Sequence, residues 1–207
     1  MRLLRRTLAA SLLLLALAPA RLPAAAALPP GVTESSYVLA GGERVLELSA
    51  DVPAGVAEVW DAWATSEGFR SWAVPFAHVD FRAGGVIESS YDPGAKAGDR
   101  NNIRNEVLAA VPQRVFVIRN VQAPEKTPFD AATFQKTLTA VTLTPLGEKQ
   151  TRVTVTNSGY QEGAPWDGVY QFFRAGNAWS LQQLRQRFEK GPVDWAKALA
   201  PAEAGKK

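Results

Sequence analysis

Residues 151–191 read TRVTVTNSGYQEGAPWDGVYQFFRAGNAWSLQQLRQRFEKG, and this stretch decides the fold. Its first part alternates β-branched and polar side chains, which predicts a strand that ends at the Gly159 corner. Apolar residues then recur every three or four positions from Trp166 to Phe188, which predicts one long helix that ends at Gly191. The rest of the chain has to supply the partners for this strand and this helix.

The chain upstream supplies further strands and two short helices. Residues 36–53 contain an alternating strand pattern, and apolar residues at helical spacing follow it from Val56, with Gly68 dividing them into two short helices. Six β-rich runs, bounded by Gly, Pro and Asp, come next: AHVDF (77–81), VIESSY (86–91), NNIRNEVLAAV (101–111), RVFVIRNV (114–121), TFQKTLTAVTLTP (133–145) and QTRVTVTNS (150–158).

This order of elements predicts an α+β fold of the helix-grip kind. A curved antiparallel sheet of about six to seven strands has one apolar face, and only the C-terminal helix is long enough to cover it. Gly176 lies in the middle of that helix, where glycine costs about 1 kcal/mol relative to alanine. We therefore expect the helix to approach the sheet closely at Gly176.

The first 27 residues predict a secretory signal peptide. Three arginines precede a leucine-rich stretch and then small residues, with cleavage expected after Ala20 or near Ala26 and Ala27. A membrane-spanning helix needs about 20 apolar residues, and prolines and an arginine at 19–23 interrupt this stretch too early. We expect a lead-in at residues 28–42, one domain at 43–195, a flexible tail at 196–207, and a protein exported from a bacterial cell to the periplasm or beyond.

Charge and cysteine content exclude several classes of partner. The formal charge of +3 comes from the leader, since removal of its four arginines from the 23 basic residues leaves 19 against 20 acidic residues. Without a Lys/Arg cluster, we expect neither nucleic acid nor anionic lipid as a partner. The absence of cysteine excludes disulfides, thiolate metal sites, thiol nucleophiles and a lipoprotein anchor.

Five motifs in the same order resemble those of the START-like, or SRPBCC, superfamily, and within it the domain family named after the activator of the ninety-kilodalton heat-shock protein's ATPase. The motifs are VWDAWATSEGFRSW (59–72), DFRAGG (80–85), VPQR (111–114), TRVTVTNSGY (151–160) and AWSLQQLRQRFEKGPVDW (178–195). The resemblance implies a cavity between the long helix and the sheet. It says little about function, because the superfamily carries many functions on one scaffold.

The resemblance also implies which residues surround the cavity. Ser89 and Tyr91 would face inward and Glu88 outward, and the Tyr160 corner would stand near the mouth. The full set of expected ligand-binding residues is Trp60, Ser89, Tyr91, Tyr160, Trp166, Tyr170 and Phe173. Aromatic residues at helical spacing are also typical of a solid core, so both interpretations stay open.

Four residues could support acid–base chemistry: His78, Glu88, Arg104 and Glu106. His78 is the only histidine, and imidazole exchanges protons readily near neutral pH. Arg104, paired with Glu106 or Glu88, could orient a ligand carboxylate or carbonyl, although a solvated cross-strand ion pair accounts for the same residues. The chain has no Gly-rich phosphate loop, no Gly-x-Ser-x-Gly elbow and no HExxH spacing, so we expect no cofactor and no dedicated metal site.

Three functional hypotheses remain. The first is an exported binding protein for a small or medium hydrophobic molecule, lipid-like, polyketide-like or aromatic, with the energy coming mainly from buried apolar surface. The second is a cyclase, dehydratase or lyase that works in the same cavity. The third is an envelope protein-interaction module with a filled core. A cochaperone role fits poorly, because an exported protein does not meet a cytosolic chaperone, and the oligomeric state is left open.

Overall fold

Alternating burial along two neighbouring strands, β3 (Arg44–Val52) and β9 (Gln150–Ser158), defines the core face of the sheet. In the computed structural model, which describes residues 27–200, Leu48 lies opposite Val155 and Ala50 opposite Val153. All four side chains are buried under the C-terminal helix, while the residues between them point to the other face.

The sheet contains nine antiparallel strands, in the order β1-β3-β9-β8-β7-β6-β5-β4, with β2 paired to β3. The other strands are β1 (Val32–Glu34), β2 (Tyr37–Val38), β4 (Phe76–Val79), β5 (Val86–Ser90), β6 (Ile103–Val111), β7 (Val115–Gln122) and β8 (Leu138–Gly147). The helices are α1 (Val56–Ala64), α2 (Ser66–Arg70), α3 (Ala131–Gln135), α4 (Ala164–Lys190) and α5 (Trp195–Ala198).

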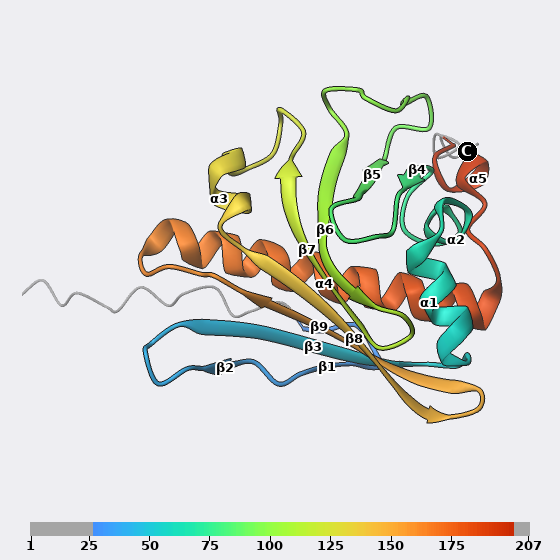
Figure 1. Ribbon diagram of the computed structural model, residues 1–207, viewed down its shortest axis with the longest axis horizontal. Coiled ribbons are helices and arrows are strands. Elements are labelled where there is room, and N and C mark those ends of the chain that lie inside the picture. Colours follow the sequence, from blue (N-terminus) through green and yellow to red (C-terminus); the bar gives the residue numbers. More distant parts are fainter. Residues whose placement is uncertain (1–26, 201–207) are drawn as a thin grey trace, which may run out of the picture.

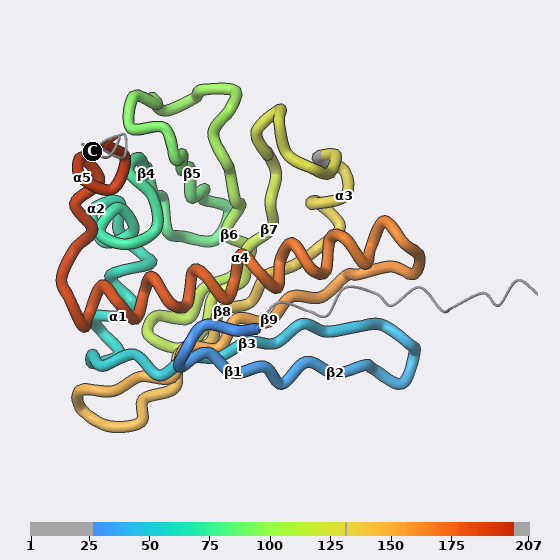
Figure 2. Tube along the Cα trace, turned by 180° about the vertical axis from the view of Figure 1, so that it is seen from behind, coloured from blue at the N-terminus to red at the C-terminus, as the bar shows by residue number. Residues whose placement is uncertain are grey.

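The predicted α+β helix-grip fold is confirmed. Helix α4 runs along the sheet. Helices α1 and α2 lie near the C-terminal end of α4, and α3 lies near the N-terminal half of α4 (Figure 1). The view from behind shows the same arrangement, with β1 and β2 at the edge beyond β3 (Figure 2). Helix α4 packs mainly against β3, where Val169, Leu181 and Leu184 are buried.

The sheet is larger than the predicted six to seven strands because the N-terminal segment adds to its edge. Strands β1 and β2 fall in residues 28–42, which we expected to be a lead-in. This segment also contacts the helix: Arg174 Nε lies 2.8 Å from Glu34 Oε2, and Arg185 donates to the Pro30 carbonyl over 3.3 Å. The lead-in is therefore an integral part of the fold.

Two local expectations are wrong. The two short helices are divided at Thr65, whose hydroxyl caps α2 by accepting from the Gly68 N–H over 2.9 Å. Gly68 lies inside α2, where a Cβ would fall 2.0 Å from the Asp61 carbonyl oxygen. The expected strand 133–145 begins with α3 instead, because the Asp130 carboxylate caps that helix by accepting from the Thr133 N–H.

The structure describes part of the C-terminal segment and little of the predicted signal peptide. Residues 1–26 of the predicted signal peptide (1–27) and residues 201–207 of the predicted tail (196–207) fall outside the described residues. Residues 193–198 form α5 and its connection, docked on α2: the Val193 N–H donates to Ser71, and the Trp195 indole donates to the Arg70 carbonyl over 2.6 Å. Within residues 27–200, no helix combines the length and apolarity needed to cross a bilayer.

The contact between α4 and β3 predicts a graded response to truncation. Leu184→Ala, at a side chain with 0% exposure, should lower the free energy of unfolding by about 2–5 kcal/mol through lost burial and a cavity. Gln171→Ala, on the exposed side of α4, should change it by no more than about 0.5 kcal/mol. Urea denaturation followed by circular dichroism measures both, and equal effects would contradict this packing.

Candidate ligand-binding cavity

A cavity of about 320 Å³ lies between α4 and the β6–β9 part of the sheet. Strands β6–β9 form one wall and one side of α4 forms the opposite wall, and α1, α2, α3 and the segments after β5 and β7 supply the remaining lining residues. The lining residues are Trp63, Phe69, Tyr91, Ile103, Asn105, Ile118, Asn120, Ala123, Pro124, Thr127, Phe134, Thr137, Thr139, Val141, Val155, Phe172, Phe173, Gly176, Asn177, Trp179 and Ser180.

Aromatic rings dominate the rim of this cavity. Tyr91, after β5, and Trp179, on α4, meet with ring centroids 6.3 Å apart, and both are exposed. At the other end Phe134 of α3 contacts Phe172 and Phe173 of α4, at 5.7 and 5.9 Å. These edge-to-face contacts hold the α3 segment against α4 and leave ring surface facing the cavity.

Gly176 lies where the cavity meets α4. A Cβ added to this residue would have no neighbour within 4 Å, apart from the helix's own backbone. The expected close approach of helix and sheet at Gly176 is therefore wrong: the glycine faces open space, and its lack of a side chain contributes to the volume of the cavity.

The cavity is polar in places but carries no charge. Its lining contains three asparagines, three threonines and a serine, and none of its residues is Asp, Glu, His, Lys or Arg. Two lining residues hold buried polar atoms without a hydrogen-bond partner, the Trp63 indole N–H and the Asn120 amide oxygen. An uncharged cavity suits a neutral, largely apolar guest.

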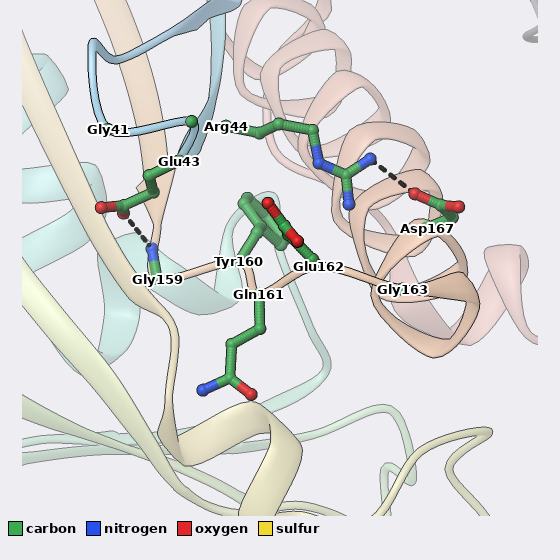
Figure 3. Close-up of a pocket in the computed structure, with 10 residues that line it drawn as sticks. Gly41, Glu43, Arg44, Gly159, Tyr160, Gln161, Glu162, Gly163 and Asp167 are labelled. Atoms are coloured by element: carbon green, nitrogen blue, oxygen red, sulfur yellow. Dashed lines mark hydrogen bonds and ion pairs between the residues drawn. The ribbon is translucent and has the colours of Figure 1, made fainter.

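A second hollow, of about 570 Å³, lies outside the core where β3 meets the start of α4. Figure 3 shows Arg44 facing Asp167, 2.6 Å apart, and the Glu43 carboxylate accepting from the Gly159 N–H over 2.8 Å. These groups already satisfy one another, and loop backbone forms much of the remaining wall. This hollow is a polar surface cleft, so the apolar cavity is the better candidate for a binding site.

Tyr160 separates the cleft from the core. Its ring contacts Tyr170 at 5.1 Å and Phe173 at 6.3 Å, and its hydroxyl is buried without a partner. Burial, and secondarily the neighbouring Tyr170, raise the pKa of Tyr160 well above its usual value. The phenol is therefore neutral at all physiological pH values and cannot act as a base.

The structure brings only two of the seven expected ligand-binding residues, Tyr91 and Phe173, to the cavity. Trp60 packs edge-on against Phe81 and Phe116, at centroid distances of 5.2 and 6.1 Å. The other four lie elsewhere: Ser89 is buried in β5, Tyr160 borders the cleft, Trp166 is buried under the Lys136 ammonium, and Tyr170 lies under the Arg44 guanidinium.

None of the four acid–base candidates lines the cavity. His78 is exposed on β4, opposite Glu88 of β5. Glu88 is buried, and its Oε1 accepts from the Gly98 N–H at 2.7 Å and from Asn102 at 2.8 Å, so this carboxylate holds the β5–β6 connection.

The expected pairing of Arg104 with Glu106 or Glu88 is wrong. Glu106 pairs with Arg119 of β7, 2.9 Å away, while Arg104 Nε is buried without a hydrogen-bond partner. Among the described residues there is also no group of three His, Asp or Glu side chains placed to hold a metal ion.

The most informative cavity residues were not predicted. Asn177 and Trp179 lie within the predicted helix, but the helical spacing of apolar residues did not indicate that they face a cavity. Thr139 and Phe134 fall in the run predicted as one strand, 133–145. The one available signal for Asn177 was the low helix propensity of asparagine, which is unfavourable in the middle of a helix.

A curved antiparallel sheet that encloses a cavity against its C-terminal helix defines a START-like, or SRPBCC, domain. Residues 53–189 match the family described as activator of Hsp90 ATPase homolog 1-like protein, and the chain belongs to that family. No curated protein matches the chain in sequence.

Several solved structures share the fold. The protein MLL2253 from Mesorhizobium loti has 18% identity and a TM-score of 0.55, over 72% of this chain and 100% of that one. The Aha1 dimer from Colwellia psychrerythraea has 16% identity and a TM-score of 0.52, over 71% and 97%. CalU16 from Micromonospora echinospora has 17% identity and a TM-score of 0.53, over 82% and 79%. At these identities the likeness concerns the fold alone.

Two glycines of α4 provide a test of the open space. Gly176→Ala should raise the free energy of unfolding by about 1 kcal/mol, since helix propensity improves and nothing obstructs the new methyl group. At Gly168 a Cβ would fall 3.3 Å from the Phe129 ring, so Gly168→Ala should gain less or destabilise. Thermal and urea unfolding measure the difference, and a destabilised Gly176→Ala protein would show that helix and sheet touch there.

Proposed function

We propose that this protein binds a small, largely apolar molecule in the cavity between α4 and the sheet. The observation that carries the proposal is an uncharged hollow of about 320 Å³ walled mainly by aromatic and aliphatic side chains. The cavity opens to solvent at Tyr91, Phe172 and Trp179, and its volume lies in the range of roughly 300–1,000 Å³ that is typical of small-molecule pockets. Membership of the family and the shared fold fit a ligand-binding SRPBCC domain.

Binding accounts for the lining better than acid–base catalysis. A cyclase or dehydratase needs a proton donor and acceptor within about 3 Å of the reacting atoms. The four acid–base candidates lie outside the cavity, and the Glu88 carboxylate accepts hydrogen bonds from the β5–β6 connection. A structural neighbour, DynU16, is described as a putative protein in the dynemicin biosynthetic locus, which supports a small-molecule role for this fold.

We further propose that the mature chain acts outside the cytoplasm, because its N-terminal residues have the pattern of a secretory signal. The family is named after the activation of a cytosolic chaperone ATPase. A protein outside the cytoplasm does not meet that chaperone, so it cannot activate it. The ligand is then a molecule that the envelope or the surroundings of the cell contain.

Filling the cavity tests the binding proposal. Purified protein should bind 2-ethylnaphthalene, a neutral probe, with one-to-one stoichiometry in equilibrium dialysis. Gly176→Leu adds a bulky side chain at an exposed position that lines the cavity, and should weaken binding by about tenfold or more. Ala175→Leu introduces the same side chain at an exposed position of α4 that does not line the cavity, and should bind as the wild type does. Absence of binding, or equal loss in both variants, would contradict the proposal.

Export is tested by the mass of the protein recovered from its host. Intact mass spectrometry should show an N-terminus created by cleavage after Ala20 or near Ala26 and Ala27, in the periplasmic or secreted fraction. Leu13→Arg, which interrupts the apolar stretch of the leader, should retain the full-length chain in the cytoplasm. A full-length wild-type chain in the cytoplasmic fraction would contradict export.

A further inference from the structure

A fully buried asparagine joins two walls of the cavity. Asn157, on β9, has 0% exposure, and its amide Nδ2 donates to the Thr139 hydroxyl on β8 over 2.6 Å. Its Oδ1 accepts a hydrogen bond from Asn177 Nδ2 on α4. Thr139 and Asn157 are opposite each other in the β8–β9 ladder, so strand register holds the pair in place. Asn157 itself does not line the cavity, but both of its partners do.

This relay determines which polar atoms of Thr139 and Asn177 remain for a ligand. The Thr139 oxygen already accepts from Asn157, so its own O–H is free to donate, and no other hydrogen bond of this hydroxyl occurs among the described residues. At the other end, Asn177 uses its Nδ2 group on Asn157, and its Oδ1 accepts from no described residue. The relay therefore presents one donor, from β8, and one acceptor, from α4, to the same cavity.

The surroundings of this donor are rich in aromatic rings. Seven of the lining residues are aromatic, contributed by α1, α2, α3, α4 and the segment after β5: Trp63, Phe69, Tyr91, Phe134, Phe172, Phe173 and Trp179. Ring faces and edges favour flat aromatic guests over flexible chains, because offset-stacked and edge-to-face contacts add to the energy of burial. The volume of about 320 Å³ equals that of roughly ten water molecules, which is enough for a guest of two fused rings.

We propose that the cavity selects a neutral aromatic carbonyl compound, oriented so that the carbonyl oxygen accepts a hydrogen bond from the Thr139 hydroxyl. Asn157 is a positioning residue in this arrangement, because it occupies one lone pair of the Thr139 oxygen and leaves the O–H to be donated into the cavity. The inference rests on the proposed binding function and adds the chemical class of the ligand and its orientation.

A pair of probes of nearly equal shape separates orientation from simple burial. 2-Acetylnaphthalene carries the carbonyl, and 2-ethylnaphthalene lacks it. Thr139→Val removes the hydroxyl at constant size, and should weaken binding of the ketone by about fivefold to tenfold while changing that of the hydrocarbon by less than about twofold. Thr139→Ser retains the hydroxyl and should preserve the ratio of the two dissociation constants.

Equal weakening of both probes by Thr139→Val would overturn the inference and leave the binding function intact. Failure of the wild-type protein to bind either probe would overturn the proposed function itself.

Because Thr139→Val leaves Asn157 Nδ2 without its acceptor and can impair folding, the wild-type complex provides a second measurement. The infrared carbonyl stretch of ¹³C-labelled 2-acetylnaphthalene should fall on binding relative to its value in a hydrocarbon solvent. An unshifted band would show that no donor reaches the carbonyl.

Discussion

The structure depends on one geometric constraint, which is that a long helix has to cover a curved sheet. Helix α4, of 27 residues, packs closely along only one of its sides, where Val169, Leu181 and Leu184 are buried against the β3 side. The sheet twists and curves away toward β6 and β7, because strands coil with a fixed hand. Gly176 consequently faces open space, and Asn177 lines the cavity while it donates to Asn157 of β9.

The distribution of charge follows from this arrangement. Ion pairs such as Glu106 with Arg119 and Asp51 with Arg152 join neighbouring strands at partly exposed positions, where water still solvates them. The Arg152 guanidinium, which donates to the carboxylate, lowers the pKa of Asp51. The polar groups of the cavity are neutral amides, hydroxyls and indoles, because an unpaired charge there would cost far more than a hydrogen-bonded amide.

The aromatic residues near residues 151–173 serve two purposes at once. Tyr160 and Tyr170 form the wall between the surface cleft and the core, whereas Phe172 and Phe173, only two and three positions further on, belong to the cavity. Successive helical residues turn by about 100°, so neighbours in the sequence face different surroundings. The density of aromatics in this stretch is therefore both core and pocket, divided by the direction of each side chain.

The sequence by itself determined the elements and their order. Alternation along 45–49 and 151–158 and the spacing from Trp166 to Phe188 are local properties, and they identified the main strands, the long helix and the helix-grip fold. It did not reveal β1 and β2, because strands of three and two residues exist only through pairing with β3. The sequence also did not reveal α3, where the Asp130 carboxylate caps a helix at residues that have a strand-like pattern.

The binding site was decided only by the tertiary structure. Strand register paired Glu106 with Arg119 and set Thr139 opposite Asn157, while the departure of the sheet from α4 left Gly176 beside open space. A shift of one residue in register would move every side chain of a strand to the other face, and no local pattern specifies that choice. Which residues meet across the cavity depends on contacts between segments far apart in the sequence, and those form only when helix and sheet pack together.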